Sequence, residues 1–95
     1  MSEYKEEILQ KAFERGYQRG IRLSRLGIIT TLLMQNHDQD FISKVTETSA
    51  LEIELVLIAM RMFQGGENIE YVTQYTKFNN EEAEKIKDCT VSKKV

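Results

Sequence analysis

The chain has 95 residues, of which 29% are charged and 41% hydrophobic, with a formal net charge of -2, no proline and one cysteine, Cys89. These values exclude a disordered or collagen-like chain and are typical of a domain in which long helices run uninterrupted. A single cysteine excludes an internal disulfide and the Cys/His spacing of a zinc site. We therefore expect one all-α domain and, because so short a chain buries only a thin core, an oligomer.

The sequence predicts a cytoplasmic protein. No run of residues approaches the ~18 apolar residues of a membrane span, and the residues after Met1 are acidic where a signal peptide would be basic. The lone cysteine fits a reducing compartment. We expect no membrane partner.

A long helix is predicted over residues 2–35, because apolar or small residues recur every three or four positions from residue 8 to residue 32. Within it, Ala12, Gly16, Gly20 and Ser24 lie four residues apart and form a stripe without a large side chain. Each glycine costs about 1 kcal/mol of helix propensity relative to alanine, so we expect a compensating contact. Close packing of another helix on this stripe is one interpretation. A kink or hinge between two shorter helices is the other.

The same helix carries a basic stripe, because Lys11, Arg15, Arg19 and Arg22 follow helical spacing. Residues 36–90, in contrast, hold five Lys/Arg against eleven Asp/Glu. The stripe is either a contact for an acidic partner, including the acidic half of a second copy, or an ordinary solvated face.

The order of apolar, helix-ending, capping and acidic residues in 32–57 recurs in residues 62–87. This duplication predicts a helix-turn-helix-like unit used twice. Asn36 and Gly66 follow apolar stretches where a left-handed residue would end a helix. Short amphipathic helices should follow at 39–47 and 68–77, with these apolar residues pointing inward: Phe41, Ile42, Val45, Tyr71, Val72 and Tyr75.

Each copy then caps a new helix. Ser49 with Glu52 has the spacing of a full capping box, and Asn79 with Glu82 has the same spacing with asparagine as the cap. The helix over 49–64 is apolar on nearly every side, so we expect it to be a buried hub that links the two copies. The helix over 80–88 is short and acidic. The single domain thus divides into a long helix (2–35), a first helical repeat with the hub helix (36–64), a second helical repeat (65–90) and a frayed tail (91–95).

The sequence contains no catalytic, metal-binding or cofactor-binding motif. His37 lies alone in a polar turn, and there is no glycine-rich phosphate loop, nucleophile elbow or metal-ligand pair at helical spacing. We therefore expect a protein that is not an enzyme and that acts through its surfaces. The expected oligomer interface consists of Phe13, Gly16, Tyr17, Gly20, Ile21, Ser24, Ile28, Leu55 and Ile58, and the expected electrostatic contact consists of Lys11, Arg15, Arg19 and Arg22.

Residues 42–53 (ISKVTETSALEI) and 72–83 (VTQYTKFNNEEA) resemble the IAxxTGLSxEEI ending of a bacterial family, the recombination-promoting nucleases (Rpn), also described as transposase-like. Residues 14–21 (ERGYQRGI) look like the glycine-spaced helix that leads into that ending. Where the family pattern has glycine, this chain has Glu47 and Lys77, which leaves the turn geometry open.

The resemblance covers only the C-terminal region of that family, because nothing in this chain corresponds to the N-terminal, metal-dependent PD-(D/E)XK nuclease domain. If Met1 is a natural start, the resemblance implies a short form translated from within the gene of a longer nuclease. Such a short form would be a homo-oligomer, a dimer or higher, and it would bind and restrain the full-length nuclease of the same gene in the manner of an antitoxin.

The alternative is a DNA-binding protein with two helix-turn-helix units. The helices that would enter the major groove begin at Ser49 and Asn79, and both carry carboxylates where phosphates would lie and no arginine to read guanine. We therefore expect DNA binding to be weak or absent, with the basic stripe as the one surface that would support it.

Overall fold

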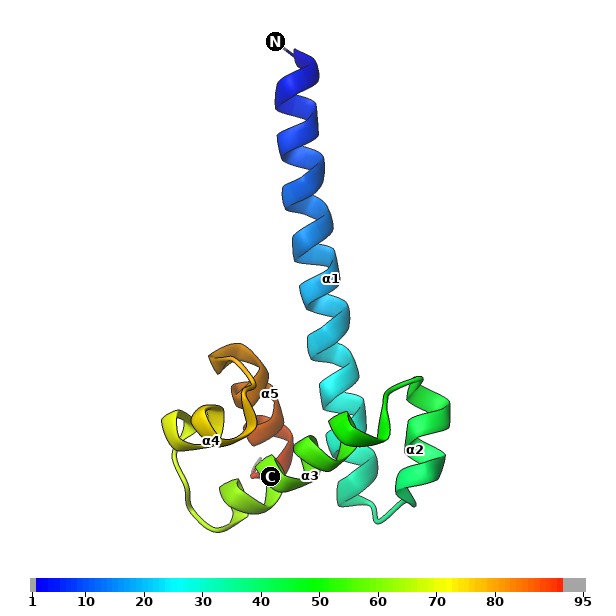
Figure 1. Cartoon of the computed structure of the whole chain (residues 1–95), viewed down its shortest axis with the longest axis vertical. Helices are drawn as coiled ribbons and strands as arrows, with labels where there is room; N and C mark the ends of the chain where they lie inside the picture. Colours follow the sequence, from blue (N-terminus) through cyan, green and yellow to red (C-terminus); the bar gives the residue numbers. More distant parts are fainter. Residues whose placement is uncertain (1, 92–95) are drawn as a thin grey trace.

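The computed structural model describes residues 2–91, with side chains described for residue 7 and from residue 10 onward. Over this range the chain forms five α-helices and no strand (Figure 1). They are α1 (Ser2–Met34), α2 (Gln39–Thr46), α3 (Ala50–Gln64), α4 (Ile69–Thr76) and α5 (Asn80–Thr90). The predicted all-α class is confirmed. Of the tail that was expected to fray, residues 92–95 lie outside the described residues.

Helix α1 runs without a break through Gly16 and Gly20, so the glycines do not divide it into two helices. Its 33 residues correspond to about 50 Å at 1.5 Å per residue. This length accounts for the longest dimension of the molecule, which measures 53 × 30 × 29 Å. The first half of α1 projects alone, while the second half packs among the other helices (Figure 1). The fold is therefore a helical head with one projecting helix.

Helix α3 lies at the centre of the head, because it contacts all four of the other helices. Five of its residues are buried: Ile53, Val56, Ala59, Met60 and Phe63. Leu55, Leu57 and Met62 are partly buried against the same core. The first turn of α3 carries an apolar side chain that is open to solvent, since Leu51 is 70% exposed. The arrangement matches the central position that its apolar sequence predicts.

A spacing of thirty residues relates three helices of the head. Leu26 in α1, Val56 in α3 and Ile86 in α5 are all buried in the same core. Thr30 and Thr90, sixty positions apart, are also buried, and each hydroxyl donates to the carbonyl oxygen four residues earlier. The second half of α1 thus shares this spacing of buried residues with α3 and α5, which the sequence comparison of residues 32–57 with 62–87 missed.

The short helices α2 and α4 bury fewer apolar side chains than the sequence predicts. Ile42 in α2 and Val72 in α4 are buried, but the apolar residues beside them are largely exposed: Phe41, Val45, Tyr71 and Tyr75. The prediction that all six point inward is wrong. Each short helix has only two turns and contacts just two neighbours, α1 and α3 for α2, and α3 and α5 for α4. A single buried stripe is all that such a helix presents to the core.

Four residues outside the helices have positive φ and end the helix before them. Asn36 (φ 66°) and Gly66 (φ 94°) do so after α1 and α3, as the sequence predicts. Glu47 (φ 53°) and Lys77 (φ 72°) do so after α2 and α4. These last two positions correspond to glycine in the pattern that the chain resembles, so their left-handed backbone settles the turn geometry.

Replacing Lys77 by glycine should therefore stabilise the fold. A non-glycine residue pays roughly 1 kcal/mol or more in the left-handed region, and the gain is reduced by the extra freedom of glycine in the unfolded chain. We expect Lys77→Gly to raise the unfolding free energy by about 0.5 kcal/mol in a urea titration. Gln74→Gly, within α4, is the matched control and should lower it by about 1 kcal/mol. A lower stability for Lys77→Gly would contradict the strain argument.

The helix caps differ in one respect from the prediction. Ser49 caps α3 by accepting a hydrogen bond from the backbone N–H of Glu52, but the full capping box is formed at α5, where Asn79 and Glu82 bond to each other's backbone. At Ser49 the reciprocal bond from the backbone N–H of Ser49 to Glu52 is not formed, and the Glu52 carboxylate instead accepts a hydrogen bond from Arg22. Asp38 and Asn68, which the sequence analysis did not identify, cap α2 and α4.

Candidate interaction surface

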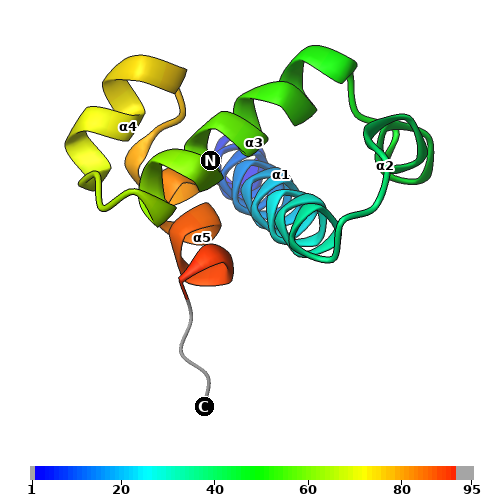
Figure 2. The same cartoon turned by 90° about the horizontal axis from the view of Figure 1, so that it is seen from below.

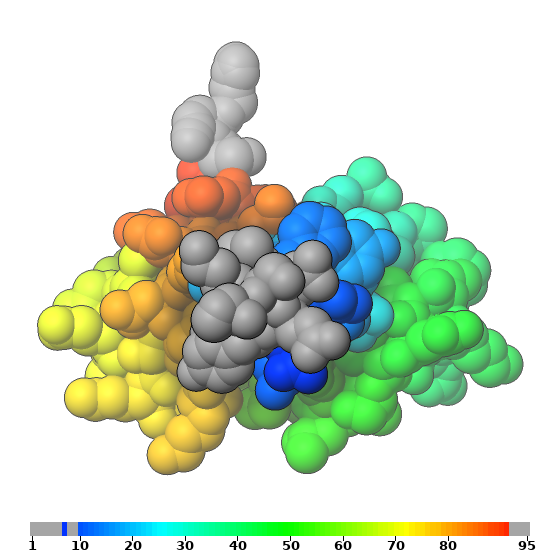
Figure 3. Space-filling model, turned by 90° about the horizontal axis from the view of Figure 1, so that it is seen from above, coloured from blue at the N-terminus to red at the C-terminus, as the bar shows by residue number. Residues whose placement is uncertain are grey.

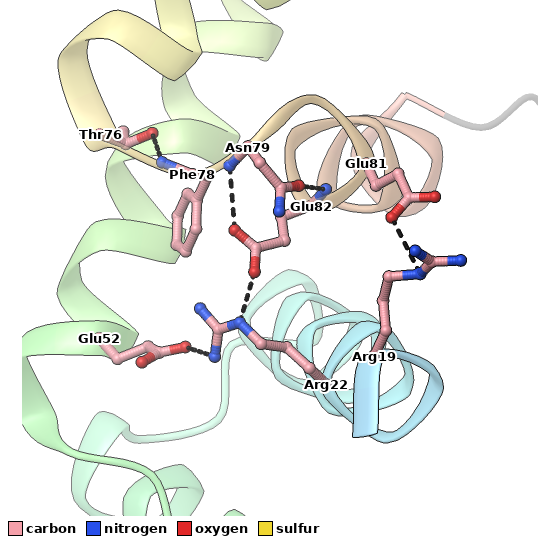
Figure 4. Close-up of polar contacts among 8 residues, drawn as sticks. All are labelled: Arg19, Arg22, Glu52, Thr76, Phe78, Asn79, Glu81 and Glu82. Atoms are coloured by element: carbon pink, nitrogen blue, oxygen red, sulfur yellow. Dashed lines mark hydrogen bonds and ion pairs between the residues drawn. The ribbon is translucent and has the colours of Figure 1, made fainter. Parts of the chain in front are cut away.

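An ion-pair cluster joins α1 to the first turns of α3 and α5 (Figure 4). Arg22 donates from Nη1 to Glu52 Oε2 at 2.7 Å and from Nε to Glu82 Oε2 at 2.5 Å. The other oxygen of Glu82 accepts from the backbone N–H of Asn79. Arg22, Glu52 and Glu82 are again thirty residues apart, so they occupy equivalent positions of the three related helices.

The cluster holds Arg22 in its charged form. Burial alone would lower the pKa of the Arg22 guanidinium, but the hydrogen bonds to Glu82 and Glu52 raise it above its ordinary value. Arg19 also lies within ion-pair distance of α5, 3.4 Å from Glu81, although both side chains are mostly exposed. Two residues of the predicted basic stripe are therefore engaged within the chain, and Lys11 and Arg15 remain exposed on the projecting part of α1.

Removing the central cation should destabilise the head. In Arg22→Ala the two half-buried carboxylates of Glu52 and Glu82 lose their shared donor and repel each other. Because the site is partly open to water, we expect a loss of about 2 kcal/mol in unfolding free energy, measured by urea titration. Arg19→Ala removes only an exposed pair and should cost about 0.5 kcal/mol or less. Equal effects of the two substitutions would contradict the structural role of Arg22.

The surface of α1 that faces away from α3 is hollowed. One hollow of about 880 Å³ is lined by Gly16, Tyr17, Gly20, Ile21, Ser24, Arg25, Ile28, Val45 and Thr46. A second of about 450 Å³ is lined by Ser24, Gly27, Ile28, Thr31, Leu32, Lys85 and Cys89. The two hollows meet at Ser24 and Ile28, and we call the surface of α1 that spans both the α1 trough. Val45 and Thr46 of α2 border the first hollow, and Lys85 and Cys89 of α5 border the second; α2 and α5 lie on different sides of α1 (Figure 2).

The projecting part of α1 continues the apolar surface of the trough. Phe13 is 74% exposed and Tyr17 is 61% exposed, and their rings stack with centroids 6.5 Å apart. Ile28 and Val45, inside the trough, are also more than half exposed. Seen from the N-terminal end, α1 rises between α5 and the pair α2 and α3 (Figure 3). A contiguous apolar surface of this kind is typical of an interaction site.

The glycines of the stripe have no packing role within one chain. A Cβ atom placed on Gly16 or Gly20 would meet nothing within 4 Å. Alanine would therefore fit at both positions and would favour the helix by roughly 1 kcal/mol each. The folded monomer gives no reason for glycine at these two places.

The structure brings together most, but not all, of the predicted interface. The seven residues on α1 share the trough and the projecting surface beside it: Phe13, Gly16, Tyr17, Gly20, Ile21, Ser24 and Ile28. Leu55 and Ile58 do not line the trough. They are half-buried on α3, and Leu55 packs on the core. Val45 and Arg25 line the trough and were not predicted; helical spacing from Ile21 would have identified Arg25, whereas Val45 comes from another helix.

The described residues show no cluster of metal-ligand side chains. They contain no group of three or more His, Cys, Asp or Glu side chains placed to hold a metal ion. His37 stacks on Phe41 with ring centroids 5.4 Å apart. Among the described helices, none combines the length and apolar character needed to cross a bilayer.

The comparisons with known proteins give no relative. No protein-family model matches the chain, and no curated protein or solved structure matches it. Surface geometry is therefore the basis for a functional assignment.

The geometry also weakens the case for two DNA-binding helix-turn-helix units. The first turns of α3 and α5 carry Glu52, Glu81 and Glu82, and Arg19 and Arg22, the arginines nearest to them, already lie in ion pairs with these carboxylates. Neither arginine is therefore free to contact a phosphate there.

Proposed function

We propose that this chain is a non-catalytic association module that forms homodimers or higher oligomers through the projecting part of α1 and the α1 trough. The observation that carries the proposal is the exposed apolar and glycine-lined surface of α1, with Phe13 and Tyr17 open to solvent on a helix half that has no neighbour. Burial of such a surface against a second copy would stabilise both helices, since an amphipathic helix gains most of its stability from packing.

We further propose that the module pairs with the same region of a longer nuclease and restrains it. This step rests on the similarity of residues 14–21, 42–53 and 72–83 to the Rpn family. The physical argument is that a surface that binds its own copy binds the same surface in any chain that carries it, so mixed oligomers form. A short form in excess would then occupy the association surface of the nuclease.

The first test is the mass of the purified chain by sedimentation over a range of concentrations. We expect a monomer–oligomer equilibrium with a midpoint at micromolar concentration. A folded monomer at every concentration up to about a hundred times that value would overturn the association module.

The second test is co-purification with the longer nuclease of the same gene, together with a DNA-cleavage assay with and without this chain. We expect a mixed complex and slower cleavage. Self-association without a mixed complex would overturn the restraint of the nuclease and leave the association module intact. An electrophoretic shift at low salt, with DNA alone, tests the alternative; a tight complex there would favour DNA binding instead.

A further inference from the structure

Helix α1 presents two surfaces of opposite shape. Residues 2–18 form a bare half, which projects beyond the other helices and is therefore convex, although Gly16 and Tyr17 at its end also line the trough. The second half forms the floor of the α1 trough, which α2 and α5 border. The two halves are of similar length, about 25 Å each. One copy of the chain thus carries both a groove and a helix that fits a groove.

We propose that the occupant of the α1 trough is the bare half of α1 from a second copy, lying antiparallel, with the two-fold axis close to Gly20 and Ile21. This inference rests on the proposed self-association and specifies its geometry. A two-fold at this point places Tyr17 of one copy opposite Ser24 of the other. It places Phe13 opposite Ile28, beside Val45. Each of these exposed apolar side chains is then covered, and each trough is filled once.

The antiparallel arrangement also matches the two shapes of α1. In a parallel pair the two troughs would face each other, and the two bare halves would face each other. In an antiparallel pair each trough receives a bare half. The small residues then allow the two α1 helices to pack closely, because Gly20 lies at the two-fold axis, where the helix axes are closest.

The exposed charges beside the apolar surface favour the same arrangement. Glu14 and Arg25 are eleven residues apart, which is about three turns, so they lie on the same side of α1. Both are exposed, and neither forms a salt bridge among the described side chains. In antiparallel helices the same side of each helix faces its counterpart. Glu14 of each copy therefore faces Arg25 of the other, and the dimer gains two equivalent ion pairs.

Disulfide trapping tests the direction of pairing. Cys89 is the one cysteine of the chain, so Cys89→Ser gives a background into which Phe13→Cys and Ile28→Cys are introduced in separate, differently tagged chains. After mixing and mild oxidation, we expect the 13–28 cross-link between unlike chains and little 13–13 cross-link. The 13–13 product, or an associated pair without the 13–28 product, would overturn the antiparallel model while self-association stands. A monomer by sedimentation would overturn the proposed function as well.

A charge exchange tests the ion pairs independently. We expect Glu14→Arg and Arg25→Glu each to weaken association by about tenfold, since each replaces two attractive pairs by two repulsive ones. The double variant should return to within about threefold of the original chain. Arg15→Glu is the matched control. Arg15 lies on the side of α1 away from Phe13 and Tyr17, so this substitution should have little effect on association. Failure of the double variant to recover would overturn the facing of Glu14 and Arg25.

Discussion

Val56→Asp should remove about 5 kcal/mol of unfolding free energy, the largest loss that we expect from a single substitution in this chain. Val56 has no exposed surface, lies in the middle of α3 and occupies the core position equivalent to Leu26 and Ile86. Aspartate there loses the apolar burial of valine, about 2 kcal/mol, and adds the cost of a buried carboxylate without a partner. Domains are stable by only about 5–15 kcal/mol, so the variant should be largely unfolded.

The matched control is Leu51→Asp, in the same helix. Leu51 is 70% exposed and lies in the first turn of α3, where a carboxylate is favourable to the helix dipole. Its unfolding free energy in urea should change by about 0.5 kcal/mol or less. If Val56→Asp had a urea midpoint close to that of Leu51→Asp, the central position of α3 in the core would be wrong.

The helices of this chain were predictable because their signals are local. The absence of proline, the apolar period and the residues Asn36 and Gly66 define where α1 and α3 run and end. The cap residues Ser49 and Asn79 define where α3 and α5 begin. Such signals act within one turn of helix, so the sequence contains them whatever the tertiary structure.

The errors arise where the answer depends on how many neighbours an element has. The apolar pattern of α2 and α4 predicts an inward face, but Phe41 and Tyr75 are exposed because so short a helix touches only two others. The pairing of Arg22 with Glu52 and Glu82 joins residues thirty and sixty positions apart, and no local rule connects them. The trough has the same origin, since its borders come from α2 and α5 and its floor from α1.

The part of the surface that the sequence did indicate is the glycine stripe, because glycine inside a helix is costly wherever the helix lies. The structure shows which of these glycines lack a contact within the chain. A Cβ atom at Gly16 or Gly20 meets nothing within the chain, and under the proposed association the cost of these glycines would be offset by contacts between chains. Substitution at Gly20 therefore separates the needs of the monomer from those of the oligomer.

Gly20→Leu should weaken self-association by roughly a hundredfold while leaving the head of the monomer folded. A leucine at the closest approach of two helices overpacks the contact twice, once from each copy, at a cost of about 3 kcal/mol in total. In the separate chain a Cβ atom at this position meets nothing within 4 Å, and leucine improves helix propensity by roughly 0.8 kcal/mol. The variant should thus be less associated in sedimentation and no less helical by circular dichroism at low concentration. Arg15→Leu, exposed on the side of α1 away from Phe13, Tyr17 and Gly20, is the matched control and should associate as the original chain does. An unchanged association constant for Gly20→Leu would mean that the glycine stripe is not at the contact, and the exposed aromatic residues beside it would then need another partner.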